Sequence, residues 1–163
     1  MKSHRFFYSI LLLVLWTPSI MASQYTNKQV DALIASGHEP DGVVFELMAW
    51  GSDTWNWAAP MLNDLRNQLK ARYPDIDIAV VSHGSEQFQL TKQAAAEQPQ
   101  AVQTLTELTG DGVSLHVCGT HSEWNNISED SYLDIVDVSP SGPAQINDYV
   151  KLGYKKIFLR KPR

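Results

Sequence analysis

The sequence predicts a three-layer α/β fold in which helices cover both faces of a mainly parallel, five-stranded sheet. Five apolar runs of strand length alternate with segments in which apolar residues recur every three or four positions. The connections between successive runs are long enough to hold a helix, as parallel strands require. Strands of parallel sheets are buried on both faces and therefore mostly apolar, as these runs are.

The five strands are expected at residues 43–49, 76–82, 113–118, 135–138 and 156–159. Glu46 interrupts the first run. Its carboxylate either takes an outward or edge position or belongs to a functional site. We favour the outward position, because charged side chains are rarely buried unless they are paired.

Helix signals fill the connections between these strands. Residues 23–41 are expected to form a leading helix, capped by Asn27 and stopped at Gly37, and a connector. A longer helix follows the loop of residues 50–53, and Pro60 must lie near its start or produce a kink. Three further helices are expected, from Pro99 to Gly110, from Ser128 to Leu133 and from Ser141 or Gly142 to Gly153.

Residues 1–22 have the pattern of a cleavable signal peptide. Lys2 and Arg5 give a positively charged start, residues 6–16 form an apolar run, and Ala22 offers a small residue at the expected cleavage point. A membrane-spanning helix needs about 20 apolar residues, so this run is too short for an anchor. We therefore expect the protein to be periplasmic or secreted.

The expected mature chain is acidic. Removal of residues 1–22 takes away two basic residues and no acidic residue, which leaves 11 Lys and Arg against 18 Asp and Glu, a net charge of −7. Such a surface repels nucleic acid and anionic lipid. We therefore expect no nucleic-acid partner, and no membrane contact once the signal is cleaved.

Three of the predicted strands end in loops that carry candidate functional residues. In an open α/β sheet, ligands bind beyond the carboxyl ends of the strands. Since parallel strands end at the same edge, these loops are expected to form one catalytic and substrate-binding pocket. The residues expected there are Trp50, Trp55, Trp57, His83, Gly84, Cys118, Gly119, Thr120, His121 and Trp124.

Cys118 is the only cysteine. An exported chain normally meets oxidising conditions, in which cysteines pair. A lone thiol is then either buried and inert or kept because it reacts, and the residues leave both interpretations open. Sulfur transfer needs a thiolate, which His121 and His83 are placed to favour.

A metal site is a further alternative. Cys118 and His121 have the spacing of half a metal site, and His116 would be a third ligand. The sequence holds no second cluster of this kind, so we expect neither a metal nor another dissociable cofactor. Signatures of nucleotide-binding loops, zinc proteases and serine hydrolases are also absent.

Four segments of residues 42–163 resemble the DsrE/DsrF-like family of sulfur-relay proteins. Residues 43–48 resemble its first strand, and residues 78–84 its second strand with a V-x-H-G ending. Residues 113–120 resemble its third strand with a C-G-T ending, and residues 142–157 its closing helix and Gly-Tyr turn. His121 stands where some members have a second cysteine.

The resemblance implies a flavodoxin-like layered fold, oligomeric rings and, at Cys118, a cysteine that accepts sulfur as a persulfide. The leading hypothesis is therefore a sulfur carrier or sulfurtransferase-like protein without a cofactor, which passes sulfur to a thiol or persulfide partner protein. We expect a homo-oligomer, a trimer or a multiple of one. The alternative is a non-catalytic oligomeric module that binds a small ligand or partner at its tryptophan-rich edge.

Overall fold

Five parallel strands form one sheet in the order β4-β3-β2-β1-β5. The computed structural model describes residues 25–162, so the predicted signal peptide lies outside the described residues. The strands are β1 (Gly42–Leu47), β2 (Asp77–Ser82), β3 (Ser114–Cys118), β4 (Asp137–Ser139) and β5 (Tyr154–Leu159). The predicted fold class is confirmed, although this strand order differs from the 2-1-3-4-5 order of flavodoxin.

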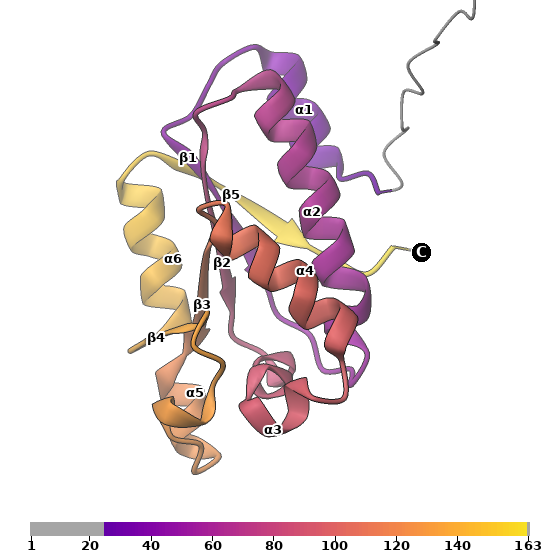
Figure 1. Ribbon diagram of the computed structural model, residues 1–163. Helices are drawn as coiled ribbons and strands as arrows, with labels where there is room; N and C mark the ends of the chain where they lie inside the picture. The colour runs from indigo at the N-terminus through magenta and orange to yellow at the C-terminus, as the bar shows by residue number, and fades with distance from the viewer. Residues whose placement is uncertain (1–24, 163) are drawn as a thin grey trace, which may run out of the picture.

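Helices cover both faces of the sheet, but unequally (Figure 1). One face carries α1 (Lys28–Ser36), α2 (Thr54–Arg72) and α4 (Pro99–Gly110), and the other carries α6 (Gly142–Lys151). Shorter elements follow the carboxyl ends of β2 and β3. They are the 3-10 helices η1 (Ser85–Leu90) and η2 (Glu129–Ser131), with α3 (Lys92–Ala95) and α5 (Gly119–Trp124). Among the described helices, none is both long and apolar enough to cross a membrane.

The alternation of side chains along β1 divides the interior into two clusters. Val43, Phe45 and Leu47 point into the main core, which α2 and α4 complete. Val44 points the other way, into a cluster whose buried members are Val44, Ala79, Val81 and Ile146 of α6. Because successive strand residues face opposite sides, the chain places its large apolar core on one face of the sheet only.

The local signals around α1 act as predicted. The Asn27 side chain accepts hydrogen bonds from the backbone N–H groups of Gln29 and Val30, which satisfies the free donors of the first turn. Gly37 ends the helix in the left-handed conformation, with φ of 69°. Val30 is fully buried in the main core, which ties α1 to the sheet.

The structure differs from the local predictions at two places and adds short helices at a third. The helix expected from Ser128 to Leu133 is wrong, since only the short 3-10 helix Glu129–Ser131 forms there. The stretch before Pro99 contains η1 and α3, which its polar composition did not reveal. Of the two alternatives for Pro60, a place near the start of α2 is wrong, because Pro60 is the seventh residue of the helix, between the buried Ala59 and Met61.

Candidate functional site

The carboxyl ends of β2 and β3 bring His83 and Cys118 together. Ser82 pairs with Val117 in the parallel register, so the next residues on the two strands are neighbours. Both approach the first residue of α6. A Cβ built on Gly142 would lie 2.7 Å from the Cβ of His83 and 3.2 Å from the Cβ of Cys118. A glycine is therefore needed where α6 packs against this pair.

A pocket of about 280 Å³ opens on these two residues. Six of the ten residues predicted for the site line it, and Ser141 and Pro143 at the start of α6 complete it. The six are Trp50, His83, Cys118, Thr120, His121 and Trp124. Cys118 is only 6% exposed, whereas Trp50 and Trp124 at the rim are 71% and 77% exposed.

The backbone of Cys118 is held by a buried glutamine of η1. The N–H of Cys118 donates to Gln87 Oε1 at 3.0 Å, and Gln87 Nε2 donates to the Cys118 carbonyl at 3.1 Å. The same Nε2 lies 3.1 Å from Ser122 Oγ, which is hydrogen-bonded to the hydroxyl of Tyr132. Burial raises the pKa of Tyr132, so this hydroxyl stays protonated and can donate.

His83 is connected to a charged pair on its other side. Its Nε2 lies 3.0 Å from Glu46 Oε1, and Glu46 Oε2 lies 3.1 Å from Lys156 Nζ. The side chains of His83 and Glu46 are 11% and 15% exposed. The outward or edge position that we favoured for Glu46 is therefore wrong. β1 lies between β2 and β5, and the carboxylate turns toward the end of β2 that carries His83.

His121 belongs to a cluster of aromatic rings. Its ring centroid lies 4.9 Å from that of Phe88, 6.5 Å from that of Trp50 and 6.3 Å from that of Trp124, each near edge-to-face. Its Nδ1 lies 3.2 Å from the carbonyl oxygen of His83. Because a carbonyl only accepts, Nδ1 carries the proton and donates this bond.

Two of the predicted tryptophans lie elsewhere. Trp55 and Trp57 belong to the first turn of α2 and not to a loop, because the helix already begins at Thr54. The Trp55 side chain is buried in the main core, and its Nε1 donates to the carbonyl of Glu86 at 2.9 Å. Trp57 packs against the core from outside and lines a different hollow beside Leu159.

Gly84, Gly119 and Thr120 shape the backbone around the pocket. A Cβ on Gly84 would overlap the backbone of Ala49 and the carboxylate of Glu86, so only glycine allows this approach. Gly119 begins α5 directly after Cys118. The N–H and hydroxyl of Thr120 both donate to the carbonyl of Pro140, which ties α5 to the loop before α6.

Sequence reasoning missed two fully buried residues of η1 that support the site. Gln87 holds Cys118, and Glu86 accepts hydrogen bonds from the N–H groups of Ala49 and Gly84 and from the hydroxyl of Ser82. A polar side chain is buried only when its partners are present. The partners of Gln87 lie more than 30 residues away, at Cys118 and in α5, so nothing in the sequence around Gln87 marks it.

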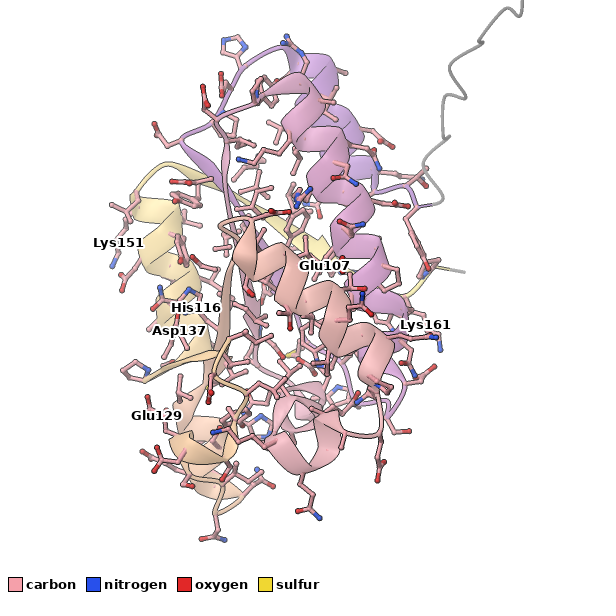
Figure 2. All side chains as sticks on the ribbon, in the orientation of Figure 1. Glu107, His116, Glu129, Asp137, Lys151 and Lys161 are labelled. Carbon is pink, nitrogen blue, oxygen red and sulfur yellow. The ribbon has the colours of Figure 1, made fainter. Side chains whose placement is uncertain are left out.

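Within residues 25–162, no three His, Cys, Asp or Glu side chains gather as metal ligands would. His116, the third ligand considered from the sequence, is bonded through Nε2 to the hydroxyl of Tyr149 at 2.8 Å. Figure 2 shows it beside Asp137, on the side of the sheet that α6 covers. The pocket itself combines one thiol, two imidazoles and the indole rings of Trp50 and Trp124.

This fold and this pocket at the carboxyl edge of a parallel sheet define an α/β protein with a cysteine site. Residues 54–159, more than half of the chain, match the sequence profile of the DsrE/DsrF-like family. The protein belongs to that family, as its motifs predicted. No curated protein matches it.

Two solved structures have the same fold. A protein of unknown function from Methanobacterium thermoautotrophicum, MTH1491, is 24% identical with a TM-score of 0.59, and the match covers 72% of this chain and 97% of that one. A conserved protein of unknown function from Bacteroides thetaiotaomicron, BT1422, is 17% identical with a TM-score of 0.52, covering 73% and 95%. At these identities the similarity establishes the fold alone.

Proposed function

We propose that this protein carries sulfur as a persulfide on Cys118, in the manner of a sulfurtransferase. The observation that carries the proposal is the pocket, which an otherwise buried thiol lines together with the imidazoles of His83 and His121. A persulfide needs protection from water and from other thiols, and the apolar lining of this pocket, with Cys118 itself only 6% exposed, favours such protection. The family membership supports the same chemistry.

The transfer moves one sulfur atom without net oxidation. The Cys118 thiolate attacks the outer sulfur of a donor persulfide, the donor's S–S bond breaks, and the donor leaves as a thiolate. Cys118 then holds the sulfur until a thiolate of a partner protein attacks in turn. His83 and His121, which both line the pocket, handle the protons of these two steps.

Intact mass spectrometry tests the proposal. Protein incubated with a low-molecular-weight persulfide should gain about 32 Da per sulfur, and the addition should be removed by a thiol reductant. Cys118→Ser should remain folded and gain nothing. A wild-type chain that gains no mass while its thiol can still be alkylated would refute the carrier function.

The exposure of Trp50 and Trp124 favours a second candidate, a non-catalytic binding module. Large aromatic side chains that frame a pocket and remain exposed are common where a ligand or partner binds. A ligand that binds there should change the tryptophan fluorescence in the wild type and in Cys118→Ser alike. A carrier should lose its function with the thiol, whereas a binding module should not.

The exposed apolar side chains also support assembly into a homo-oligomer, a trimer or a multiple of one. Met48, Trp50 and Trp124 lie beyond the ends of β1 and β3, and Phe158 lies beside Glu46 in the strand register. Covering such side chains is a common role of subunit contacts. Light scattering should give a mass above that of one chain, and a monomer at high concentration would refute the assembly.

The proposed setting of this chemistry is the periplasm or the outside of the cell, after removal of residues 1–22. N-terminal sequencing of the exported protein should then begin near Ser23. A mature chain that retains residues 6–16 would contradict export by a cleaved signal.

A further inference from the structure

The pocket contains two histidines, and their surroundings differ. The imidazole of His121 is surrounded by the rings of Phe88, Trp50 and Trp124, and its Nδ1–H is used on the carbonyl of His83. No carboxylate pairs with it among residues 25–162. The imidazole of His83 faces a carboxylate, Glu46 Oε1, at 3.0 Å from its Nε2.

The contact with Glu46 determines which nitrogen of His83 carries the proton. A carboxylate accepts but does not donate, so Nε2 holds the hydrogen and Nδ1 holds the lone pair. Among the hydrogen bonds of residues 25–162, none reaches Nδ1, from the Cys118 thiol or from another group, so its lone pair is available to a proton. His83 and Cys118 directly follow the paired residues Ser82 and Val117, and both side chains approach Gly142, so this nitrogen belongs to the imidazole that neighbours the thiol.

We propose that Cys118, His83 and Glu46 form a proton relay in which His83 is the base for the thiol and Glu46 is a positioning residue. The S–H bond of Cys118 breaks, and its proton moves to His83 Nδ1. The resulting imidazolium donates from Nε2 to Glu46, whose negative charge stabilises it. After sulfur transfer, His83 returns the proton to the departing donor thiolate. The overall exchange converts one thiol and one donor persulfide into one persulfide and one donor thiol.

Glu46 and Lys156 act on the imidazole of His83 in opposite directions. Glu46 from β1 favours the imidazolium, and Lys156 from β5 opposes it while it pairs with the other oxygen of Glu46. His121 from α5 faces the carbonyl of His83. Glu86 from η1 is already occupied by three hydrogen bonds, including one from the N–H of Gly84. From α6, the neighbour of His83 is Gly142, which carries no charge.

The test is the rate of iodoacetamide labelling of Cys118 in the native protein, measured against pH. Glu46→Gln keeps the shape of the side chain and removes its charge. Its labelling at neutral pH should fall by roughly tenfold, with the whole profile moved to higher pH, as expected for loss of an opposite charge within 4–6 Å. His83→Gln should give a similar fall, and the double variant should fall no further, because both changes remove one interaction.

Lys156→Gln distinguishes the relay from a merely structural role by the direction in which the pH profile of Cys118 labelling moves. Without the ammonium group, the full charge of Glu46 acts on His83, so the labelling profile should move to lower pH. If Lys156 and Glu46 only support the fold, Lys156→Gln should label Cys118 more slowly than the wild type or leave the labelling profile unchanged. Lys151→Gln is the matched control, since Lys151 lies on α6 about 14 Å along the helix from Gly142 and pairs with Asp148. Its profile should match the wild type.

The inference and the proposed function can fail separately. If Glu46→Gln is folded by circular dichroism and labels like the wild type at every pH, the relay is wrong. If Glu46→Gln does not fold, an upward shift in Lys156→Gln overturns the relay and a downward shift supports it. If the profiles move as expected but Cys118 gains no sulfur, the relay stands and the carrier function is lost.

Discussion

The two faces of the sheet perform different tasks. On the face of α2 and α4, strand residues such as Phe45 and Leu115 join one large apolar cluster. On the face of α6, the same strands carry Glu46, His116 and Cys118, and four buried apolar residues make up the cluster around Ile146. One face thus supplies the stability of the fold, and the other has room for titratable groups.

This division follows from the alternation of strand side chains. A buried carboxylate or imidazole costs free energy unless it has a partner. The three helices on the first face cover it mainly with apolar side chains, and its buried carboxylate, Glu86, is held by three hydrogen bonds at the end of β2. A single helix, α6, covers the other face (Figure 1). Variants on the two faces should therefore differ in what they change, stability or thiol chemistry.

The largest expected effect is on the main core. Leu65→Ala in α2 should lower the free energy of unfolding by about 3–5 kcal/mol, because the helices and strands around it cannot close the cavity. Ile146→Ala in α6 removes a side chain of the same size, and should cost about 2–3 kcal/mol, because α6 can move toward the open side. Guanidinium unfolding measures both. Equal losses would mean that the two faces are packed alike.

Trp55 in the main core and Trp50 at the rim of the pocket allow a second comparison between the core and the site. Trp55→Phe leaves the carbonyl of Glu86 without its donor and should cost about 1–3 kcal/mol. Trp50→Phe removes exposed surface at the rim of the pocket and should change stability by less than about 0.5 kcal/mol. Thermal unfolding compares the two, and a destabilised Trp50→Phe would place that ring in a packed core.

The close approach of α6 to the site can be tested with a methyl group. Gly142→Ala adds a Cβ 2.7 Å from that of His83, so α6 must shift at a cost of about 1–3 kcal/mol. We also expect slower alkylation of Cys118. Gly110→Ala is the control, because a Cβ there meets nothing within 4 Å. Unchanged stability and alkylation in Gly142→Ala would show that α6 is not fixed against the sheet.

Local patterns predicted the fold and much of the site. Apolar runs and caps such as Asn27 and Gly37 act over a few residues, so they can be read directly from the chain. The pocket residues from Trp50 to Trp124 were predicted because parallel strands must end at one edge. That rule needs only the order of the strands and the residues that follow each one.

What could not be predicted depends on which side chains meet across the fold. Trp55 was assigned to the pocket because it follows a loop, and the single helical turn from Thr54 that buries it is set by packing. Glu46 was assigned outward because a charged residue interrupts an apolar strand, and its partner His83 lies 37 residues away. Gln87 has its partners at Cys118 and Ser122, more than 30 residues further along the chain.

The smallest expected effect is the pH dependence that His116 gives to the face of α6. Burial lowers the pKa of His116, and the charge of Asp137 opposes the shift only in part. Its Nδ1 is buried without a hydrogen bond, 3.9 Å from the nearer carboxylate oxygen of Asp137. The folded protein therefore disfavours the proton that the unfolded chain binds near pH 6.5. Where the unfolded state binds more protons, stability rises with pH, so it should fall as the pH drops below about 6.5.

Urea unfolding at pH 7.5 and pH 5.5 measures how much free energy of unfolding the protein loses between the two pH values, and this loss is compared between variants. His116→Gln should lose less stability between the two pH values than the wild type, since the side chain no longer titrates. Asp137→Asn should lose more, because removal of the carboxylate lowers the pKa of His116 further. His38→Gln is the control, since His38 is exposed and should leave the wild-type loss unchanged. A smaller loss in Asp137→Asn would mean that His116 is protonated in the folded state and paired with Asp137. The charge on this face would then stabilise the fold at low pH instead of weakening it.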